Sequence, residues 1–187
     1  ELEWMISEGG NSGIFHHVVE QPGRAIYWSG IEMQIIDSDG FGRDRLSDLQ
    51  HSGALYDMRA ANPQNEKPQG EWNHTKIISD GPKIEYWQNG EKIVEYERWN
   101  AEWYEMVRNS KFECQPSFGN APKGHIGLQD HGDSETSEYG KSKTRGADRI
   151  CCRRGELLRP VLLSASPYAV IQRQHLFRID QLPINPT

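Results

Sequence analysis

Two short segments of the chain alternate apolar side chains with polar ones that could take part in proton transfer and hydrogen bonding. Glu32 and Gln34 alternate with apolar residues in the first segment, and Gln129 and His131 do so in the second. In a β-strand alternate side chains share a face, so each segment predicts a strand with one apolar face and one hydrogen-bonding face. If both strands belong to one sheet, the four polar side chains could converge on one ligand. The alternative is the ordinary solvent face of an antiparallel sheet.

The elements that must position these side chains are mostly β-strands. In the first half of the chain, short strand-like segments begin and end at turn residues, and long helical patterns are missing. Both observations favour an all-β sandwich or barrel. The clearest signal is a hairpin over residues 83–96, whose Asn89-Gly90 pair suits a type I′ turn. One short helix is predicted over residues 101–109, with Asn100 as its N-cap. Further predicted strand segments cover residues 13–19, 30–37, 53–58 and 72–79.

Two other motifs contain residue types that bind metals. His16 and His17 are adjacent, and adjacent side chains of a strand face opposite sides, so this pair is not expected to form a metal site. Residues 37–40 read Asp-Ser-Asp-Gly, similar to the start of a calcium loop, but the twelve-residue ligand pattern is not completed. These motifs therefore predict no cofactor.

The composition indicates a globular protein with a very polar surface. The hydrophobic share is 35% and the charged share 26%, and no apolar run approaches the roughly 20 residues of a membrane-spanning helix. Three cysteines without CxxC spacing argue against a disulfide framework and a structural zinc site. The formal net charge of −6 disfavours nucleic acid as a partner, because like charges repel. Phosphate-loop, dinucleotide-binding, zinc-protease and serine-hydrolase motifs are also missing.

The composition changes near residue 133. All six tryptophans precede it, whereas residues 134–187 are first rich in Lys and Arg and then apolar without a clean period. We therefore predict a partial domain over residues 1–133, whose first strand lacks its start, and an atypical tail over residues 134–187. We expect the tail to be either disordered or the product of a shifted reading frame, which the underlying nucleotide sequence would test.

Six short blocks carry a resemblance to a known family. They read GNSGIF at 10–15, IEMQIID at 31–37, GALY at 53–56, GEWN at 70–73, EYWQNG at 85–90 and GHIGLQDHG at 124–132. In their order and spacing these blocks resemble the 3-keto-disaccharide hydrolase family. The resemblance implies a concanavalin A-like jelly-roll β-sandwich that acts on sugars, truncated here at its N-terminus. It also implies a periplasmic or secreted bacterial protein.

The resemblance further implies an activity and roles for the site residues. The expected reaction is cleavage of the glycosidic bond of a 3-keto-glycoside or 3-keto-disaccharide, by elimination or hydrolysis. Because a C3 ketone acidifies the C2 proton, His131 is the candidate base and Glu32 the candidate acid for the leaving oxygen. Gln34 and Gln129 would orient hydroxyl groups or the developing enolate. A divalent metal held by His131 and Glu32 is an alternative to these roles.

Two further residues are candidates for substrate binding. Asn11 lies in an Asn-Ser-Gly segment that would present polar groups at the rim of the site, and the Tyr56 ring could stack on a sugar. Both residues have ordinary alternatives, since Asn is a common turn former and a strand tyrosine often packs half-buried.

Two other functions remain open from the sequence. A non-catalytic carbohydrate-binding module could use the same sandwich, because one fold hosts many functions. A retaining or inverting glucanase needs two carboxylates about 5–10 Å apart. Gln34 stands where a second carboxylate on the face of Glu32 would be expected, which weakens the glucanase interpretation.

Overall fold

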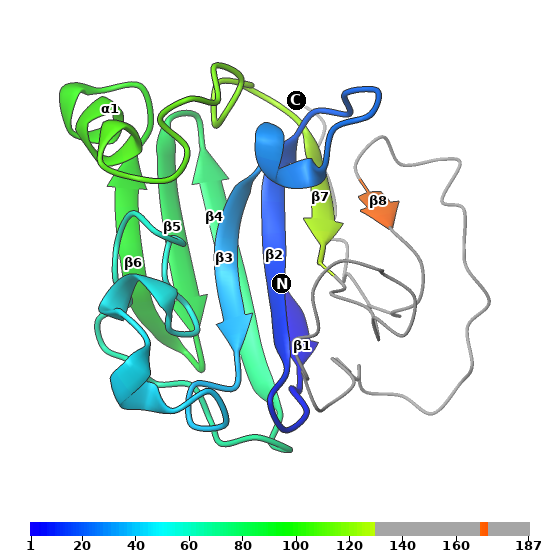
Figure 1. Ribbon diagram of the computed structural model, residues 1–187, viewed down its shortest axis with the longest axis vertical. Helices are drawn as coiled ribbons and strands as arrows, with labels where there is room; N and C mark the ends of the chain where they lie inside the picture. Colours follow the sequence, from blue (N-terminus) through cyan, green and yellow to red (C-terminus); the bar gives the residue numbers. More distant parts are fainter. Residues whose placement is uncertain (130–168, 172–187) are drawn as a thin grey trace, which may run out of the picture.

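Two β-sheets and one short helix make up the described part of the chain. The computed structural model describes residues 1–129 and 169–171 (Figure 1). The predicted all-β sandwich with one short helix is confirmed. The strands are β1 (Leu2–Trp4), β2 (Asn11–Val18), β3 (Ile31–Ile36), β4 (Asn73–Asp80), β5 (Lys83–Gln88), β6 (Glu91–Glu97), β7 (His125–Leu128) and β8 (Ala169–Ile171). The helix α1 spans Ala101–Arg108, and short 3₁₀ helices span η1 (Ile26–Trp28), η2 (Arg43–Arg45) and η3 (Asp48–Gln50).

The order of the strands brings the two polar segments of the sequence into one sheet. The first sheet has the order β1-β4-β5-β6 and the second β3-β2-β7-β8. Neighbouring strands pair antiparallel, except that β8 runs parallel to β7. Because β3 and β7 flank β2 on opposite sides, residues near 32 and near 129 lie two strands apart in the same sheet (Figure 1).

Local sequence signals account for the hairpin and the helix. Asn89 and Gly90, between β5 and β6, have φ angles of 52° and 87°, the positive values that a type I′ turn requires. Asn100 caps α1, since its side chain accepts a hydrogen bond of 2.8 Å from the Trp103 N–H. Trp103 is the one buried residue of α1 and packs the helix against the sandwich core.

A run of stacked aromatic rings joins α1 to the core. The Trp103 ring stacks on Tyr96 of β6 and on Phe118, at centroid distances of 5.6 and 6.0 Å. Phe118 stacks in turn on Phe112 at 4.0 Å. All four side chains are buried, and rings of this size bury a large apolar area. The segment after α1 is therefore anchored from Phe112 onward.

The His16–His17 pair departs from the prediction. The register of β2 against β7 shifts between Phe15 and Val18, and His17 adopts a φ angle of 56°. This β-bulge brings the two rings together, with their Nδ1 atoms 2.6 Å apart. His16 Nε2 is also 2.8 Å from the Tyr86 hydroxyl oxygen. The expectation of opposite faces was wrong because side chains alternate only where a strand has no bulge.

The predicted strand at residues 53–58 is instead a turn with isolated bridges. Leu55 pairs with Met33 of β3 and with Arg59. Asp57 has a φ angle of 60°, which belongs to the left-handed region and not to a strand. The segment still lies along the edge of β3 that faces away from β2.

Part of the predicted domain organisation lies outside the described residues. Of the tail predicted over residues 134–187, the structure describes only β8. The shifted or disordered character of the tail and the boundary near residue 133 therefore stay predictions. Within the described ranges, no helix combines the length and the apolar character that crossing a membrane requires.

Candidate active site

The register of β2 and β3 turns Glu32 and Gln34 away from the sandwich core. Glu32 is opposite Phe15, and Gln34 is opposite Gly13. Met33, between them, is fully buried in the core cluster. Because successive side chains of a strand alternate, Glu32, Gln34 and Gly13 share the outer face of this sheet. We call this outer face of β3, β2 and β7 the site face.

Two more predicted residues lie on the site face. Gln129 directly follows β7, and its N–H donates to the Gly13 carbonyl oxygen at 3.0 Å. Its own carbonyl oxygen accepts a hydrogen bond of 2.8 Å from Ser12 Oγ. Gly13 is thus flanked by Gln34 on one side and Gln129 on the other. Asn11, two residues before Gly13 on β2, belongs to the same face.

Tyr56 extends the site face beyond β3. Its N–H donates to the Glu32 carbonyl oxygen at 3.1 Å, and the Gln34 N–H donates to the Ala54 carbonyl oxygen at 3.0 Å. Leu55 is fully buried in the core, and Tyr56 is half-buried, with its ring partly against the core cluster and partly under the Lys111 ammonium group. The hydrogen bond to Glu32 sets Tyr56 beside that residue. The segment that is not a strand therefore still places an aromatic ring next to the predicted acid.

Glu32 is a buried carboxyl group with no hydrogen-bonding partner among the described residues. It is 6% exposed, and its side chain packs over Gly13, where a β-carbon would overlap the carboxyl group. Burial raises the pKa of Glu32 to about 7, while the positive charge of Lys111 acts in the opposite direction. A substantial fraction of Glu32 is therefore protonated at neutral pH, which is the state that a general acid needs.

Gln34 presents a buried polar atom that lacks a partner. The residue is 3% exposed, and its Oε1 atom accepts no hydrogen bond from any described residue. Buried polar atoms are nearly always hydrogen bonded in native proteins, so an exception calls for an explanation. A bound ligand with a hydroxyl group would supply the missing donor.

Lys111 also lies at the site, although no sequence pattern predicted this position. Its ammonium group lies 3.9 Å from the centre of the Tyr56 ring, and its charge acts on Glu32. Its backbone N–H donates to Asp57 Oδ2 at 2.8 Å. Lys111 comes from the loop after α1, so only the fold brings it near β3. A single lysine in a polar loop gives no signal from which this could be predicted.

Residues 1–141 match the family of 3-keto-alpha-glucoside-1,2-lyase-like domains. The chain belongs to this family. A 3-keto-disaccharide hydrolase of Bacteroides thetaiotaomicron is 36% identical over 154 residues, which cover 71% of this chain and 53% of that protein. The chain therefore spans about half the length of this relative. A crystal structure of a "putative glycosyl hydrolase" from Parabacteroides distasonis is similar with a TM-score of 0.65 and 33% identity, over 70% of this chain and 64% of that chain.

The candidate base of this 3-keto-alpha-glucoside-1,2-lyase-like domain lies outside the described residues. His131 follows Gln129 by two positions in the sequence. The structure thus brings together five of the six predicted site residues on one face, and the place of His131 stays a prediction. The catalytic and binding roles of all six are likewise predictions.

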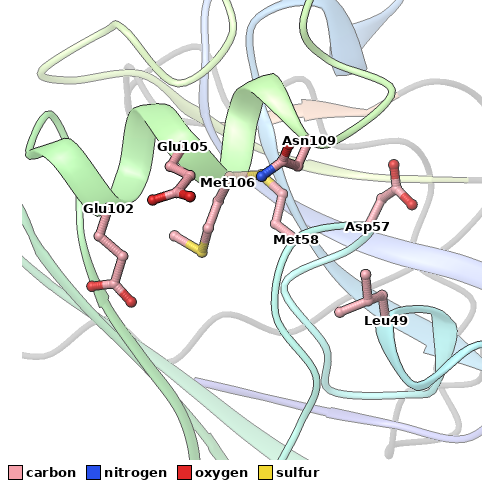
Figure 2. A pocket seen from close by; sticks show the side chains of 7 residues that line it. All are labelled: Leu49, Asp57, Met58, Glu102, Glu105, Met106 and Asn109. Carbon is pink, nitrogen blue, oxygen red and sulfur yellow. The ribbon is translucent and has the colours of Figure 1, made fainter.

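A separate hollow of about 280 Å³ lies between α1 and the turn that follows η3. Figure 2 shows side chains of α1 above this hollow and those of the turn on its other side. It is lined by Leu49, Asp57, Met58, Glu102, Glu105, Met106 and Asn109. None of the predicted site residues lines it. Asp57 links the two regions, because it lines the hollow and also holds the Lys111 backbone.

The described residues offer no cluster of three or more His, Cys, Asp or Glu that could hold a metal ion. The motif at residues 37–40 has a structural role instead. Asp37 Oδ2 accepts a hydrogen bond of 2.8 Å from the Gly9 N–H, and Oδ1 accepts one of 3.1 Å from the Gly40 N–H. The alternative of a metal held by Glu32 and His131 depends on a residue outside the described ranges.

Proposed function

We propose that this domain cleaves the glycosidic bond of 3-keto-glycosides, including 3-keto-disaccharides, by elimination or hydrolysis. Membership of the family and the identity to a 3-keto-disaccharide hydrolase support this substrate class. One observation carries the proposal. Glu32 is a buried carboxyl group with a pKa of about 7, on the same face as two amide side chains and an aromatic ring. A periplasmic or secreted location is part of the same proposal.

The proposed reaction uses the acidity of the C2 proton next to a C3 ketone. A base, for which His131 is the candidate, takes this proton, and the electron pair forms an enolate with its negative charge on the C3 oxygen. The enolate then restores the ketone, forms a C1–C2 double bond and expels the C1 oxygen, which takes the Glu32 proton. Water can add across the double bond to give the hydrolysis product.

The other site residues would bind and orient the sugar. Gln34 and Gln129 flank Gly13, where the absence of a side chain leaves room for the Glu32 carboxyl group between them. The unpaired Gln34 Oε1 suits a sugar hydroxyl. Tyr56 offers a ring for stacking, and Asn11 lies further along the same face.

The main rival is a carbohydrate-binding module without catalysis on the same sandwich. To separate the two, we would assay the chain, Glu32→Gln and His131→Ala on one disaccharide in its native and 3-keto forms. Binding would be measured by calorimetry in parallel. We expect the wild-type chain to cleave only the 3-keto form, and each variant to lose roughly 100-fold or more in turnover while still binding it.

The outcomes are distinct. Equal binding of both sugars without any turnover by the wild-type chain would support the binding module and refute the enzyme. Unchanged turnover in Glu32→Gln would remove Glu32 from the mechanism. A large loss of thermal stability in His131→Ala, together with lost binding, would assign His131 a structural role.

A further inference from the structure

The part of the chain that the structure describes places a positive charge next to the site face and pairs it with no carboxylate. The Lys111 ammonium group forms no ion pair among the described residues. Its contacts are aromatic, at 3.9 Å from the Tyr56 ring centre and 5.2 Å from the Phe112 ring centre. The carboxyl group on which it acts belongs to Glu32, which is largely buried and partly protonated near neutral pH. Among the described residues, the charge of Lys111 is therefore only partly neutralised near neutral pH.

Lys111 is held in this position from both sides. Its backbone N–H donates to Asp57 Oδ2, and Asp57 directly follows Tyr56. The next residue, Phe112, is 1% exposed and stacks on Phe118. The side chain itself stays exposed, so the ammonium group can contact a ligand without first leaving a buried pocket. Such a fixed backbone with an accessible charge is a preorganised electrostatic group.

The proposed reaction needs positive charge at one atom of the sugar. When the C2 proton leaves, negative charge develops on the C3 oxygen. Gln34, Gln129 and a protonated Glu32 can supply hydrogen bonds but no net charge. A positively charged hydrogen-bond donor stabilises such an oxyanion more strongly than a neutral donor does.

We propose that the Lys111 ammonium group binds the C3 carbonyl oxygen of the substrate and stabilises the enolate oxyanion that forms there. The inference rests on the proposed function and adds to it the group that recognises the ketone. The ammonium group keeps its protons throughout, since it acts only by charge and hydrogen bonding. A native sugar has a hydroxyl group at C3 and develops no such charge, so Lys111 makes the site selective for oxidised sugars.

The test compares three substitutions in the full chain. Lys111→Met removes the charge and keeps the length of the side chain, and Lys111→Arg keeps the charge. Lys76→Met is the matched control, because the Lys76 ammonium also lies over an aromatic ring, at 5.5 Å from the centre of Trp87, but on the other sheet. Both lysine side chains are at the surface, so the fold should survive in all three variants, which thermal unfolding would check.

Three readouts are taken on a 3-keto disaccharide: turnover, exchange of the C2 proton with deuterium by NMR, and binding by calorimetry relative to the native disaccharide. We expect Lys111→Met to lose roughly 100-fold in turnover and in exchange, Lys111→Arg to recover part of both, and Lys76→Met to match the wild-type chain. Removing the Lys111 charge should also raise the pKa of Glu32 further, so the basic limb of the pH profile should move to higher pH in Lys111→Met alone.

The possible results distinguish the role of Lys111 from the proposed function of the domain. If the wild-type chain turns over the 3-keto sugar and Lys111→Met does so equally well, the inference is wrong and the proposed function stands. If the wild-type chain shows no turnover but binds the 3-keto form selectively and exchanges its C2 proton, both in a way that depends on Lys111, the inference stands and the proposed function falls. If the wild-type chain neither cleaves nor selectively binds the 3-keto form, both are refuted.

Discussion

Replacing Glu32 with glutamine should stabilise the protein at alkaline pH and not at acidic pH. Glutamine has nearly the same shape as glutamate and carries no charge at any pH. In the wild-type chain, Glu32 must ionise in a buried position above its raised pKa of about 7. The ionised form is costly there because burial removes its water and no described residue hydrogen bonds it.

The sign and size of the effect follow from proton linkage. Below the ordinary glutamate pKa of 4.5, Glu32 is protonated in both the folded and the unfolded state. Between 4.5 and about 7 only the unfolded state ionises, so the free energy of unfolding falls as the pH rises. Above a pH of about 7, the folded state carries the full free-energy cost of ionising the buried Glu32. The difference between the two pKa values corresponds to about 3 kcal/mol.

The assay is urea unfolding of the wild-type chain and Glu32→Gln from pH 4.5 to pH 9. All other titrating groups are common to both proteins, so the difference between their free energies of unfolding isolates Glu32. We expect this difference to grow from near zero to about 3 kcal/mol, or roughly 6–12 °C in melting temperature for a domain of this size. Glu97→Gln at the end of β6 is the control, because its side chain is exposed and loses little hydration on folding.

One result would refute the reasoning. If the difference between Glu32→Gln and the wild-type chain stays constant over this pH range, Glu32 does not ionise at unusual cost, and its role as an acid loses its physical basis. If the difference grows as expected while turnover is lost, the buried carboxyl group exchanges stability for activity, as functional residues often do.

Three further predictions concern other parts of the fold. Burial lowers the pKa of His16, and lowers that of His17 to about 4. The contribution of His17 to the free energy of unfolding should therefore fall by about 2 kcal/mol as the pH is lowered from 6.5 to 4, less than for a fully buried ring because water screens part of His17. The difference between the wild-type chain and His17→Asn, which tolerates the positive φ angle, isolates this contribution in urea titrations, because Glu32 is common to both proteins. Gly13→Ala should push the Glu32 side chain toward solvent, lower its pKa and move the basic limb of the pH–rate profile to lower pH. Gly90→Ala, at a φ angle of 87°, should cost about 1 kcal/mol of stability in thermal unfolding.

The parts of the fold that were predictable from the sequence depend on local chemistry. The turn at Asn89-Gly90 and the cap at Asn100 need only their immediate neighbours, and both are present. The shared face of Glu32 and Gln34 also follows from alternation within one strand. Placing Gln129 on that face needed one more step, the pairing of β7 with β2, which the sequence left as a condition and the structure supplies.

The parts that were not predictable depend on contacts between distant segments or on broken regularity. The meeting of His16 and His17 requires a bulge, which leaves no clear mark in a run of strand-forming residues. Lys111 reaches Tyr56 because the aromatic stack behind Phe112 fixes the loop, and this stack joins residues from α1, β6 and the segment between α1 and β7. The burial of Glu32 likewise follows from packing over Gly13, which alternation alone does not predict.

The sign of the charge at the site distinguishes between two ways of cleaving a glycosidic bond. A classical glycosidase stabilises an oxocarbenium ion, which is positive, and it does so with a carboxylate beside the sugar. The site face has the opposite character, since Glu32 is partly protonated near neutral pH, Gln34 is neutral and Lys111 is positive. Such a site would destabilise an oxocarbenium ion and stabilise an anion. The enolate derived from a C3 ketone is an anion of this kind, so these electrostatics support our proposal of elimination from a 3-keto sugar over the alternative of direct displacement on a native one.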